Sequence, residues 1–297
     1  MISELKRKKN ALILAHYYQT MDIQNIADYV CDSFEMARRA RDAKEDLLII
    51  CGVHFMAESA KILNPEKTVL IPAPDAGCPM ADMIEPEDVT ALREKYPDAA
   101  VVCYVNSSCA VKAVSDICCT SSSAEKIVRA LPEKRIIFIP DRNLGAYVAS
   151  KIPEKEIILF DGYCPAHDRV TEQDVLEAKD TYPDARFLIH PECRKEVLAY
   201  ADYIGSTAGI IGEALGSAGK EFVIGTETGV VERLRMLAPD KIFHPLTGGF
   251  ICPNMKKCRI SDVENSLKNG EFEITLPDSE IAAARQTLER MVTLGAG

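Results

Sequence analysis

The chain has 297 residues, of which 47% are hydrophobic and 27% are charged, and its formal net charge at pH 7 is −10. This composition is ordinary for a globular protein with room for two or three compact units. The negative charge argues against nucleic-acid and anionic-membrane partners, because both need clustered lysine and arginine. The first apolar run, ALILA at residues 11–15, is too short for a signal-peptide core, and no run approaches the roughly 20 residues of a membrane span. We therefore expect a cytoplasmic protein.

Short apolar runs alternate with amphipathic segments from the start of the chain. The first third contains the runs ALILA, LLIICGV (47–53) and TVLIPAP (68–74), with the amphipathic segment FEMARRARDA (34–43) between the first two. Strands buried in a parallel sheet read as continuous apolar runs, and the helices that connect them have one apolar face. The pattern predicts β/α units joined by right-handed crossovers.

The same order of elements returns twice. The second set of runs is AVVCYV (100–105), RIIFIPD (135–141) and EIILFDG (156–162), and the third is RFLIH (186–190), FVIGTETG (222–229) and KIFHPLTG (241–248). The segments EDVTALREKYPDA and QDVLEAKDTYPDA agree at many positions with an offset of 86 residues, and Asp28, Asp116 and Asp202 are 88 and 86 residues apart. These matches indicate three homologous units of about 87 residues.

Each unit is expected to be a small αβα sandwich with a parallel sheet, and the three units to surround a pseudo-threefold axis. The predicted boundaries are residues 1–86, 87–172 and 173–260, followed by a helical tail at residues 261–297. The last helix should begin near Asp278. The tail has no evident counterpart in the repeat and is expected to pack against the first unit. Because open α/β sheets bind ligands beyond the carboxyl ends of their strands, polar residues there are the site candidates.

The chain contains eleven cysteines. Without a secretion signal they are more typical of metal ligands, reactive thiols or core residues than of disulfides. Cys51 and Cys103 lie inside apolar runs and are expected in the core. Cys78, Cys164 and Cys252 differ, since each precedes a proline after the last apolar run of its unit, at separations of 86 and 88 residues. Around a threefold axis these thiolates would converge at the centre.

Three converging thiolates suit more than one centre. A structural zinc ion would need a fourth protein ligand, such as His167, and usually comes with paired CxxC motifs, which the sequence lacks. A 4Fe-4S cluster held by three cysteines leaves one iron open to act as a Lewis acid. Three buried thiols without metal are the remaining alternative. The spacing favours an iron–sulfur cluster.

Nine motifs resemble those of the quinolinate synthases. In chain order they are HYYQ at His16, CDS at Ser33, DAGCPMADM, YVNSS, DGYCPAHDRV, HPEC, GSTAGI, GTETG and CPNMK, spread over essentially the whole chain. The resemblance implies three αβα units around a central 4Fe-4S cluster, with Cys78, Cys164 and Cys252 as the ligands. It leaves Cys258, in the same loop as Cys252, outside the cluster.

The resemblance also implies a reaction. Quinolinate synthases serve NAD biosynthesis by condensing iminoaspartate with dihydroxyacetone phosphate to quinolinate, with loss of phosphate and water. No net electron transfer is required, so the open iron would act as a Lewis acid. The iminoaspartate would arrive free or through transient contact with the enzyme that makes it.

Three hydroxyl residues occupy equivalent positions where a strand ends and a helix begins. Ser33, Ser121 and Thr207 are separated by 88 and 86 residues, and each is predicted to be the N-cap of its helix. Helix N-termini attract anions. The three hydroxyls are therefore candidate ligands for the carboxylates and the phosphate of the substrates.

The candidates for proton transfer follow the first strand of each unit and match the family's motifs. They are His16, Tyr18, Tyr104, Asn106, His190 and Glu192. Glu192 is assigned as the general base, with Tyr18 and His190 assisting proton transfers. Tyr104 completes this catalytic set and, with Asn106 and His16, is expected to orient a carboxylate or phosphate. For His167 the sequence offers no preference between a substrate contact and a structural role.

Two other functions remain open. Another 4Fe-4S-dependent hydroxy-acid dehydratase would share the open iron but not the condensation. An iron–sulfur redox sensor or carrier would need a fully ligated cluster and would have no use for the HYYQ and HPEC motifs. Binding of a dicarboxylate would separate these alternatives, because only an open iron would change its spectrum.

Overall fold

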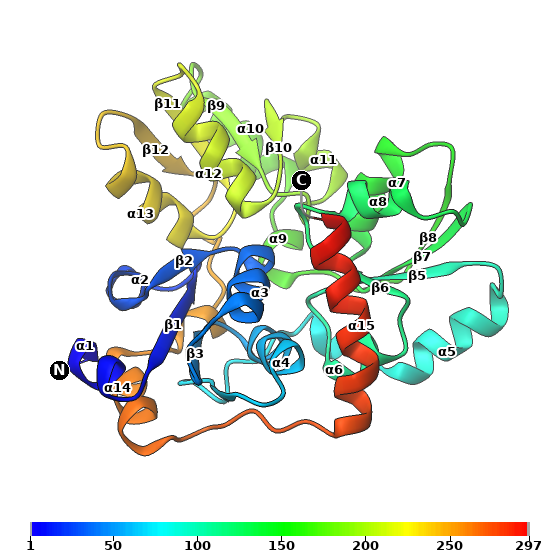
Figure 1. Cartoon of the computed structure of the whole chain (residues 1–297). Coiled ribbons are helices and arrows are strands. Elements are labelled where there is room, and N and C mark those ends of the chain that lie inside the picture. Colours follow the sequence, from blue (N-terminus) through cyan, green and yellow to red (C-terminus); the bar gives the residue numbers. More distant parts are fainter. Residues whose placement is uncertain (1, 296–297) are drawn as a thin grey trace.

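Three parallel sheets organise the molecule. The computed structural model describes residues 2–295, and within them twelve strands form three four-stranded sheets. The strand orders are β2-β1-β3-β4, β6-β5-β7-β8 and β10-β9-β11-β12, so each sheet has the same topology. Helices flank every sheet (Figure 1). The predicted α/β fold of three αβα units is confirmed.

The first sheet contains β1 (Ala11–His16), β2 (Tyr29–Cys31), β3 (Leu47–Cys51) and β4 (Thr68–Leu70). Its helices are α1 (Ile2–Lys8), α2 (Met21–Ile26), α3 (Ser33–Asp42) and α4 (His54–Leu63), followed by the short 3-10 helix η1 (Ala81–Met83). Strand β1 lies between β2 and β3, with Leu14 opposite Tyr29 on one side and Ile50 on the other.

The second sheet contains β5 (Ala100–Tyr104), β6 (Ile117–Cys119), β7 (Arg135–Ile139) and β8 (Glu156–Leu159). Its helices are α5 (Pro86–Lys95), α6 (Cys109–Ala113), α7 (Ala124–Ala130), α8 (Arg142–Lys151) and α9 (Pro165–Asp168). Val102 of β5 lies opposite Ile117 and Phe138, in the position that Leu14 has in the first sheet.

The third sheet contains β9 (Arg186–Ile189), β10 (Tyr203–Ile204), β11 (Glu221–Gly225) and β12 (Ile242–Pro245). Its helices are α10 (Glu172–Thr181), α11 (Lys195–Leu198), α12 (Thr207–Gly216) and α13 (Thr228–Leu237), followed by the 3-10 helix η2 (Asn254–Lys256). Leu188 of β9 lies opposite Tyr203 and Ile224, again the equivalent position.

The aspartate that recurs in the sequence has the same task in each sheet. The carboxylates of Asp28, Asp116 and Asp202 accept hydrogen bonds from the backbone N–H groups of Ile13, Val101 and Phe187, at 2.9, 2.7 and 2.7 Å. The N–H of each aspartate donates to the carbonyl of the same first-strand residue. Each aspartate therefore fixes where the second strand starts beside the first, which explains its recurrence.

The strongest internal match is explained by a shared helix cap. Helices α5 and α10 both begin with a capping box, in which Asp88 and Asp174 accept the N–H groups of the residues three positions before them. Helix α14 (Ile260–Asn269) begins with the same box at Asp262. The prediction that the tail has no counterpart in the repeat is therefore wrong for α14, because this helix follows the third Cys-Pro turn as α5 and α10 follow the first two.

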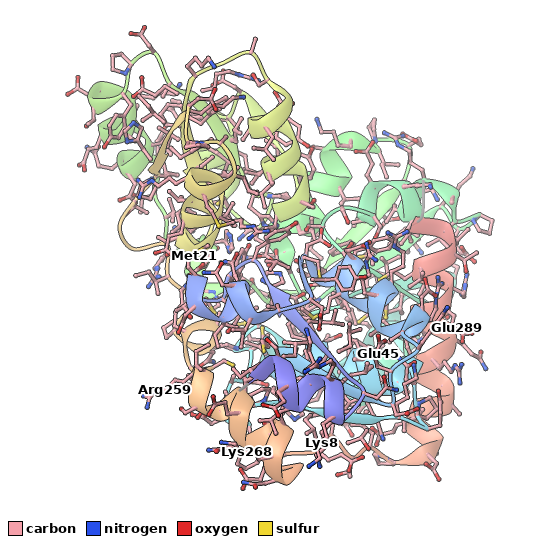
Figure 2. The ribbon with its side chains drawn as sticks, turned by 60° about the vertical axis from the view of Figure 1, so that its left-hand side comes forward. Lys8, Met21, Glu45, Arg259, Lys268 and Glu289 are labelled. Carbon is pink, nitrogen blue, oxygen red and sulfur yellow. The ribbon has the colours of Figure 1, made fainter. Side chains whose placement is uncertain are left out.

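Both tail helices pack on the first unit, and α15 also packs on the second. Helix α14 packs against α1 and β3, as predicted for the tail, and Figure 2 shows Lys268 of α14 on the same side as Lys8 of α1. Helix α15 (Asp278–Gly295) begins at the predicted residue and packs against α4 of the first unit and α6, α7 and β6 of the second (Figure 1). It therefore bridges two units. No helix in the described residues is long and apolar enough to cross a membrane.

The buried apolar side chains are divided unequally among the units. One cluster runs through the first and second units and includes Cys51, Cys103 and the inner face of α15. The third unit has two separate clusters, with Phe187 and Leu188 on opposite faces of its sheet. The first two units therefore share a core, whereas the third has its own.

Candidate active site

The three sheets point their strand ends at one cavity of about 370 Å³. Strands β1, β5 and β9 each lie between the next two strands of their unit, which is the topological switch point where open α/β sheets bind ligands. The cavity is lined by every site residue predicted from the sequence: His16, Tyr18, Ser33, Cys78, Tyr104, Asn106, Ser121, Cys164, His190, Glu192, Thr207 and Cys252. The structure brings these residues together, and their roles remain predictions.

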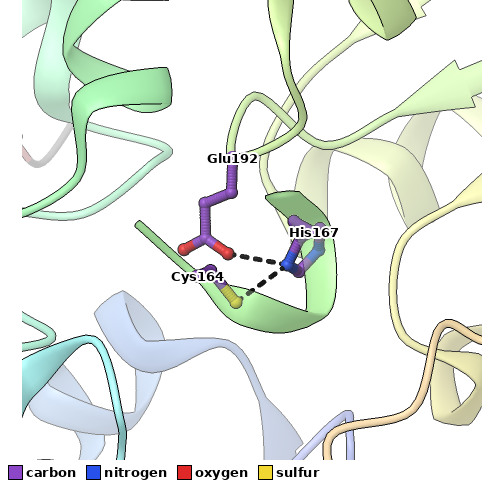
Figure 3. Close-up of side chains that lie close together, drawn as sticks. All are labelled: Cys164, His167 and Glu192. Carbon is purple, nitrogen blue, oxygen red and sulfur yellow. Dashed lines mark hydrogen bonds and ion pairs between the residues drawn. The ribbon is translucent and has the colours of Figure 1, made fainter. Parts of the chain in front are cut away.

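Glu192 lies at the centre of the polar contacts. The hydroxyl of Tyr104 donates to its Oε1 at 2.6 Å, and Nδ1 of His167 lies 2.9 Å from its Oε2 (Figure 3). Burial raises the pKa of this carboxyl, but His167 and His190 and the hydrogen bonds from His167 and Tyr104 lower it by more, so the pKa lies below its usual value. Glu192 is therefore a buried carboxylate that is ionised at neutral pH.

A chain of hydrogen bonds extends from this carboxylate. Nε2 of His167 lies 3.0 Å from the hydroxyl of Thr226, which lies 2.8 Å from the hydroxyl of Tyr18. Tyr18 in turn lies 3.1 Å from the Thr207 hydroxyl. Burial, followed by the charge of Glu192, raises the pKa of Tyr18, so the phenol keeps its proton. The network connects side chains from all three units.

The two histidines that end the first strands are buried and neutral. Burial lowers the pKa of His16 to about 3 and that of His190 to about 4. The His16 ring makes an edge contact with Tyr18, with the centroids 4.5 Å apart. Nε2 of His190 lies 3.2 Å from the Ser121 hydroxyl. At neutral pH both rings can donate and accept hydrogen bonds without carrying charge.

The predicted N-caps are wrong in all three units. The caps of α3, α7 and α12 are Asp32, Ser123 and Ser206, which stand one or two positions away from Ser33, Ser121 and Thr207. Asp32 accepts the N–H of Glu35, and Ser206 accepts that of Gly209. Ser123 makes no side-chain cap hydrogen bond in α7. None of the three predicted hydroxyls is at the N-cap position, and all three line the cavity.

The thiols of the three Cys-Pro turns line the same cavity. Cys78, Cys164 and Cys252 are half-buried and make no disulfide. Burial raises the pKa of Cys78 to about 12 and raises those of the other two, and the charge of Cys252 raises that of Cys78 further. Thiols with raised pKa values become thiolates beside a positive charge such as a metal ion. The buried Oδ1 of Asn106, which lines the same cavity, has no hydrogen-bond partner in the described residues and can accept from a bound ligand.

A second metal arrangement involves His167. Ligand atoms of Cys164, His167 and Glu192 lie within 4.8 Å of one another, as a single ion would require. Figure 3 shows Nδ1 of His167 between the other two, 3.2 Å from the Cys164 sulfur. The same nitrogen interacts with Glu192, so a metal bound there would have to replace that contact.

Four residues outside the predicted set support the site. Glu227 is fully buried, caps α13, accepts the N–H of Gly229 at 2.7 Å and pairs with Lys256 at 3.0 Å. Lys256 also donates to the carbonyl of Tyr18 at 2.7 Å. Thr226 joins the hydrogen-bond chain, and Arg169 brings a permanent positive charge to the cavity wall. Thr226 and Glu227 lie in the GTETG motif, Lys256 in CPNMK and Arg169 in DGYCPAHDRV. The motifs could have pointed to these residues, but only the contacts indicate what each one does.

Known proteins match the chain along nearly its whole length. The family described as "Quinolinate synthetase A protein" matches residues 1–293. The chain belongs to this family. It is 53% identical to the quinolinate synthase of Caldicellulosiruptor saccharolyticus over 293 residues, which cover 99% of this chain and 97% of the relative. It is 49% identical to quinolinate synthase 2 of Methanosarcina acetivorans, with 99% and 94% covered, and 46% identical to the quinolinate synthase of Thermodesulfovibrio yellowstonii, with 99% and 97% covered.

Membership of the quinolinate synthase family identifies the chain as an enzyme. The family resemblance of the nine motifs is confirmed, because the match extends beyond them to residues 1–293. In this family member the strand ends of all three units line a single cavity, so the candidate active site depends on all three units.

Proposed function

We propose that this quinolinate synthase family member condenses iminoaspartate with dihydroxyacetone phosphate to quinolinate, with loss of phosphate and water. The observation that carries the proposal is a single cavity holding one Cys-Pro cysteine from each unit together with the buried carboxylate of Glu192. We expect the enzyme to act in the cytoplasm, with iminoaspartate arriving free or by transient contact with the enzyme that makes it.

The donor set fits a 4Fe-4S cluster held by Cys78, Cys164 and Cys252. Such a cluster with three protein ligands supplies an open iron that acts as a Lewis acid on a substrate hydroxyl or carboxylate. The proline after each cysteine fixes the backbone torsion φ at the turn and thereby limits the directions of the thiolate. Three free, half-buried thiols at one cavity support this assignment.

Proton transfer is assigned to the chain's own side chains. Glu192 would take a proton from carbon or nitrogen of a bound intermediate, and its hydrogen bonds from Tyr104 and His167 hold it in place. Tyr18 and His190 would return or relay protons, since both stay protonated or neutral in the cavity. A buried base beside neutral donors can move a proton without creating a second buried charge.

Substrate anions would be held by a mixture of charge and hydrogen-bond donors. Ser33 and Thr207 are the first residues of α3 and α12, where backbone N–H groups lack partners within the helix. Ser121 and His16 add further donors, and Asn106 adds an amide. Arg169 supplies local positive charge in an otherwise acidic protein. These groups suit two carboxylates and a phosphate.

The first experiment measures iron and acid-labile sulfide per chain after anaerobic purification. We expect about four of each in the wild type and their loss in Cys78→Ala, Cys164→Ala and Cys252→Ala, because each ligand is needed to hold the cluster. Cys258→Ala is the matched control. Its thiol is buried in the same loop region but packs beside Cys51, and it should keep the cluster.

The outcome separates the alternatives. Zinc bound through Cys164, His167 and Glu192 would leave iron absent and would contradict the proposal. A cluster that gives no quinolinate from the two substrates but dehydrates a hydroxy acid would favour the dehydratase. A cluster whose spectrum does not respond to a dicarboxylate would favour a sensor or carrier.

A further inference from the structure

A buried carboxylate outside the catalytic cavity links the second and third units. The side chain of Asp168, 6% exposed, accepts from Nδ2 of Asn143 at 2.9 Å, from Arg142 at 3.2 Å and from Arg194 at 2.8 Å. The three donors come from two units: Arg142 and Asn143 open helix α8 of the second unit, and Arg194 precedes α11 of the third. We call these four residues the Asp168 clasp.

The clasp is connected directly to the two residues that face each other in the site. Asp168 follows His167 in the chain, and Arg194 stands two residues after Glu192. Nδ2 of Asn143 also donates to the backbone carbonyl of Glu192 at 3.1 Å. One carboxylate therefore controls the backbone on both sides of the 2.9 Å contact between His167 and Glu192.

A second cavity lies behind the segments that carry His167 and Glu192, so these segments need polar contacts to hold them in place. His167 and Glu192 line the catalytic cavity, whereas all four clasp residues line a second cavity of about 560 Å³ between α8 and α11. The wall between the two cavities is therefore not backed by a packed core. The large core of the first two units does not extend into the third, and of the second unit Val170 and Tyr147 join one of the third unit's clusters. Polar contacts of the clasp therefore add to this limited packing in holding the wall in register.

We infer that Asp168 is a positioning residue that sets the distance between His167 and Glu192. The inference rests on the proposed function, in which Glu192 is the base. Asp168 touches neither substrate nor metal in this account. It acts through the α9 backbone on His167 and through Asn143 and Arg194 on the segment that carries Glu192. Loss of this carboxylate should impair the chemical step more than substrate binding.

The test compares Asp168→Ala with Asp161→Ala. Both aspartates pair with Arg142, at 3.2 and 2.6 Å, but Asp161 is 90% exposed and contacts no other part of the clasp in the described residues. We expect Asp168→Ala to lower kcat about 10²-fold, the usual effect of misplacing a reacting group by about 1 Å. KM and iron per chain should stay close to wild type, and Asp161→Ala should match wild type in all three.

Two further measurements test the positioning role of Asp168. Asn143→Ala, which removes the bonds to both Asp168 and the Glu192 carbonyl, should show the same loss of kcat at unchanged KM, and it decides the matter if Asp168→Ala does not fold. A crystal structure of Asp168→Ala should show His167 Nδ1 and Glu192 Oε2 beyond hydrogen-bonding distance. The distance in the crystal can be measured whatever reaction the enzyme catalyses. If the wild type made no quinolinate, the proposed function would be refuted, but the inference about Asp168 would still be tested by this distance. Wild-type kcat in both variants, or an intact contact in the crystal, would refute the inference.

Discussion

At the residue scale, equivalent backbone positions in the three units carry different side chains in the site. Tyr18, Asn106 and Glu192 occupy equivalent positions just beyond the first strand of each unit, yet one is a phenol, one an amide and one a carboxylate. The repeat supplies the backbone geometry, and substitution within it supplies the chemistry. Only the third unit places an ionised acid there, which makes Glu192 the candidate base.

The bond between Tyr104 and Glu192 gives a prediction for activity. Tyr104→Phe removes the donor to Glu192 Oε1, and Glu192→Gln removes the proton acceptor itself. We expect kcat to fall about 10²-fold in the first variant and about 10⁴-fold in the second, the range found for general acid–base groups. Steady-state assays with iron analysis on the same samples check this.

Tyr200→Phe is the matched control for these variants. It also removes a tyrosine hydrogen bond to a glutamate, from Tyr200 to Glu172, but at the surface. Its kcat should equal that of wild type. Near-normal turnover of Glu192→Gln with the cluster intact would show that the base is another residue.

At the element scale, the last two helices, α14 and α15, pack against the repeat units and connect them. Helix α14 follows the third Cys-Pro turn and packs on the first unit, so the third repeat closes onto the first. Helix α15 has no capping-box partner in the repeat and packs across the first and second units. These two units share a core partly because α15 contributes Leu288 and Met291 to it.

The bridging task of α15 predicts an asymmetry along the helix. Leu288 is fully buried, whereas Leu294 is 37% exposed on the same helix. Leu288→Ala should lower the free energy of unfolding by about 2–5 kcal/mol, because it leaves a cavity in the shared core. Leu294→Ala should change it by less than about 1 kcal/mol. Urea unfolding of both variants checks this, and equal effects would mean that α15 is not part of the core.

At the scale of the whole molecule, the active site is the place where three units meet. Each unit contributes one Cys-Pro cysteine and one first-strand end to the same cavity. The third unit has its own apolar clusters, and of the other two units Val170, Tyr147, Tyr17 and Tyr18 belong to these clusters or pack against them. A metal centre with one ligand from each unit would tie them together.

This arrangement predicts that metal removal weakens the fold. A group bound only by the folded protein stabilises it by linkage, so the metal-free enzyme should unfold several degrees lower, at roughly 2–4 °C per kcal/mol for a chain of this class. Cys252→Ala should already show the lower Tm and should not change on treatment with chelator. Thermal unfolding under argon, with and without chelator, measures both. An unchanged Tm after complete loss of iron would mean that the centre does not join the units.

Much of the fold was determined by local features of the sequence. Continuous apolar runs specify buried parallel strands, and Asp28, Asp116 and Asp202 fix the second strand within about 15 residues of the first. Regular spacing then places the three cysteines at equivalent turns. Each of these features involves residues of a single unit. They can therefore be predicted from the sequence without knowing how the units are arranged.

The tertiary structure alone decided which polar groups meet. It assigned the helix caps to Asp32 and Ser206 rather than to their neighbours, placed His167 against Glu192, and joined Asp168 to Arg194. A cap one residue away satisfies the same pattern, because several adjacent side chains in each segment can accept the bond. Contacts between units depend on how separately folded sheets are oriented, and no local pattern of residues encodes that orientation.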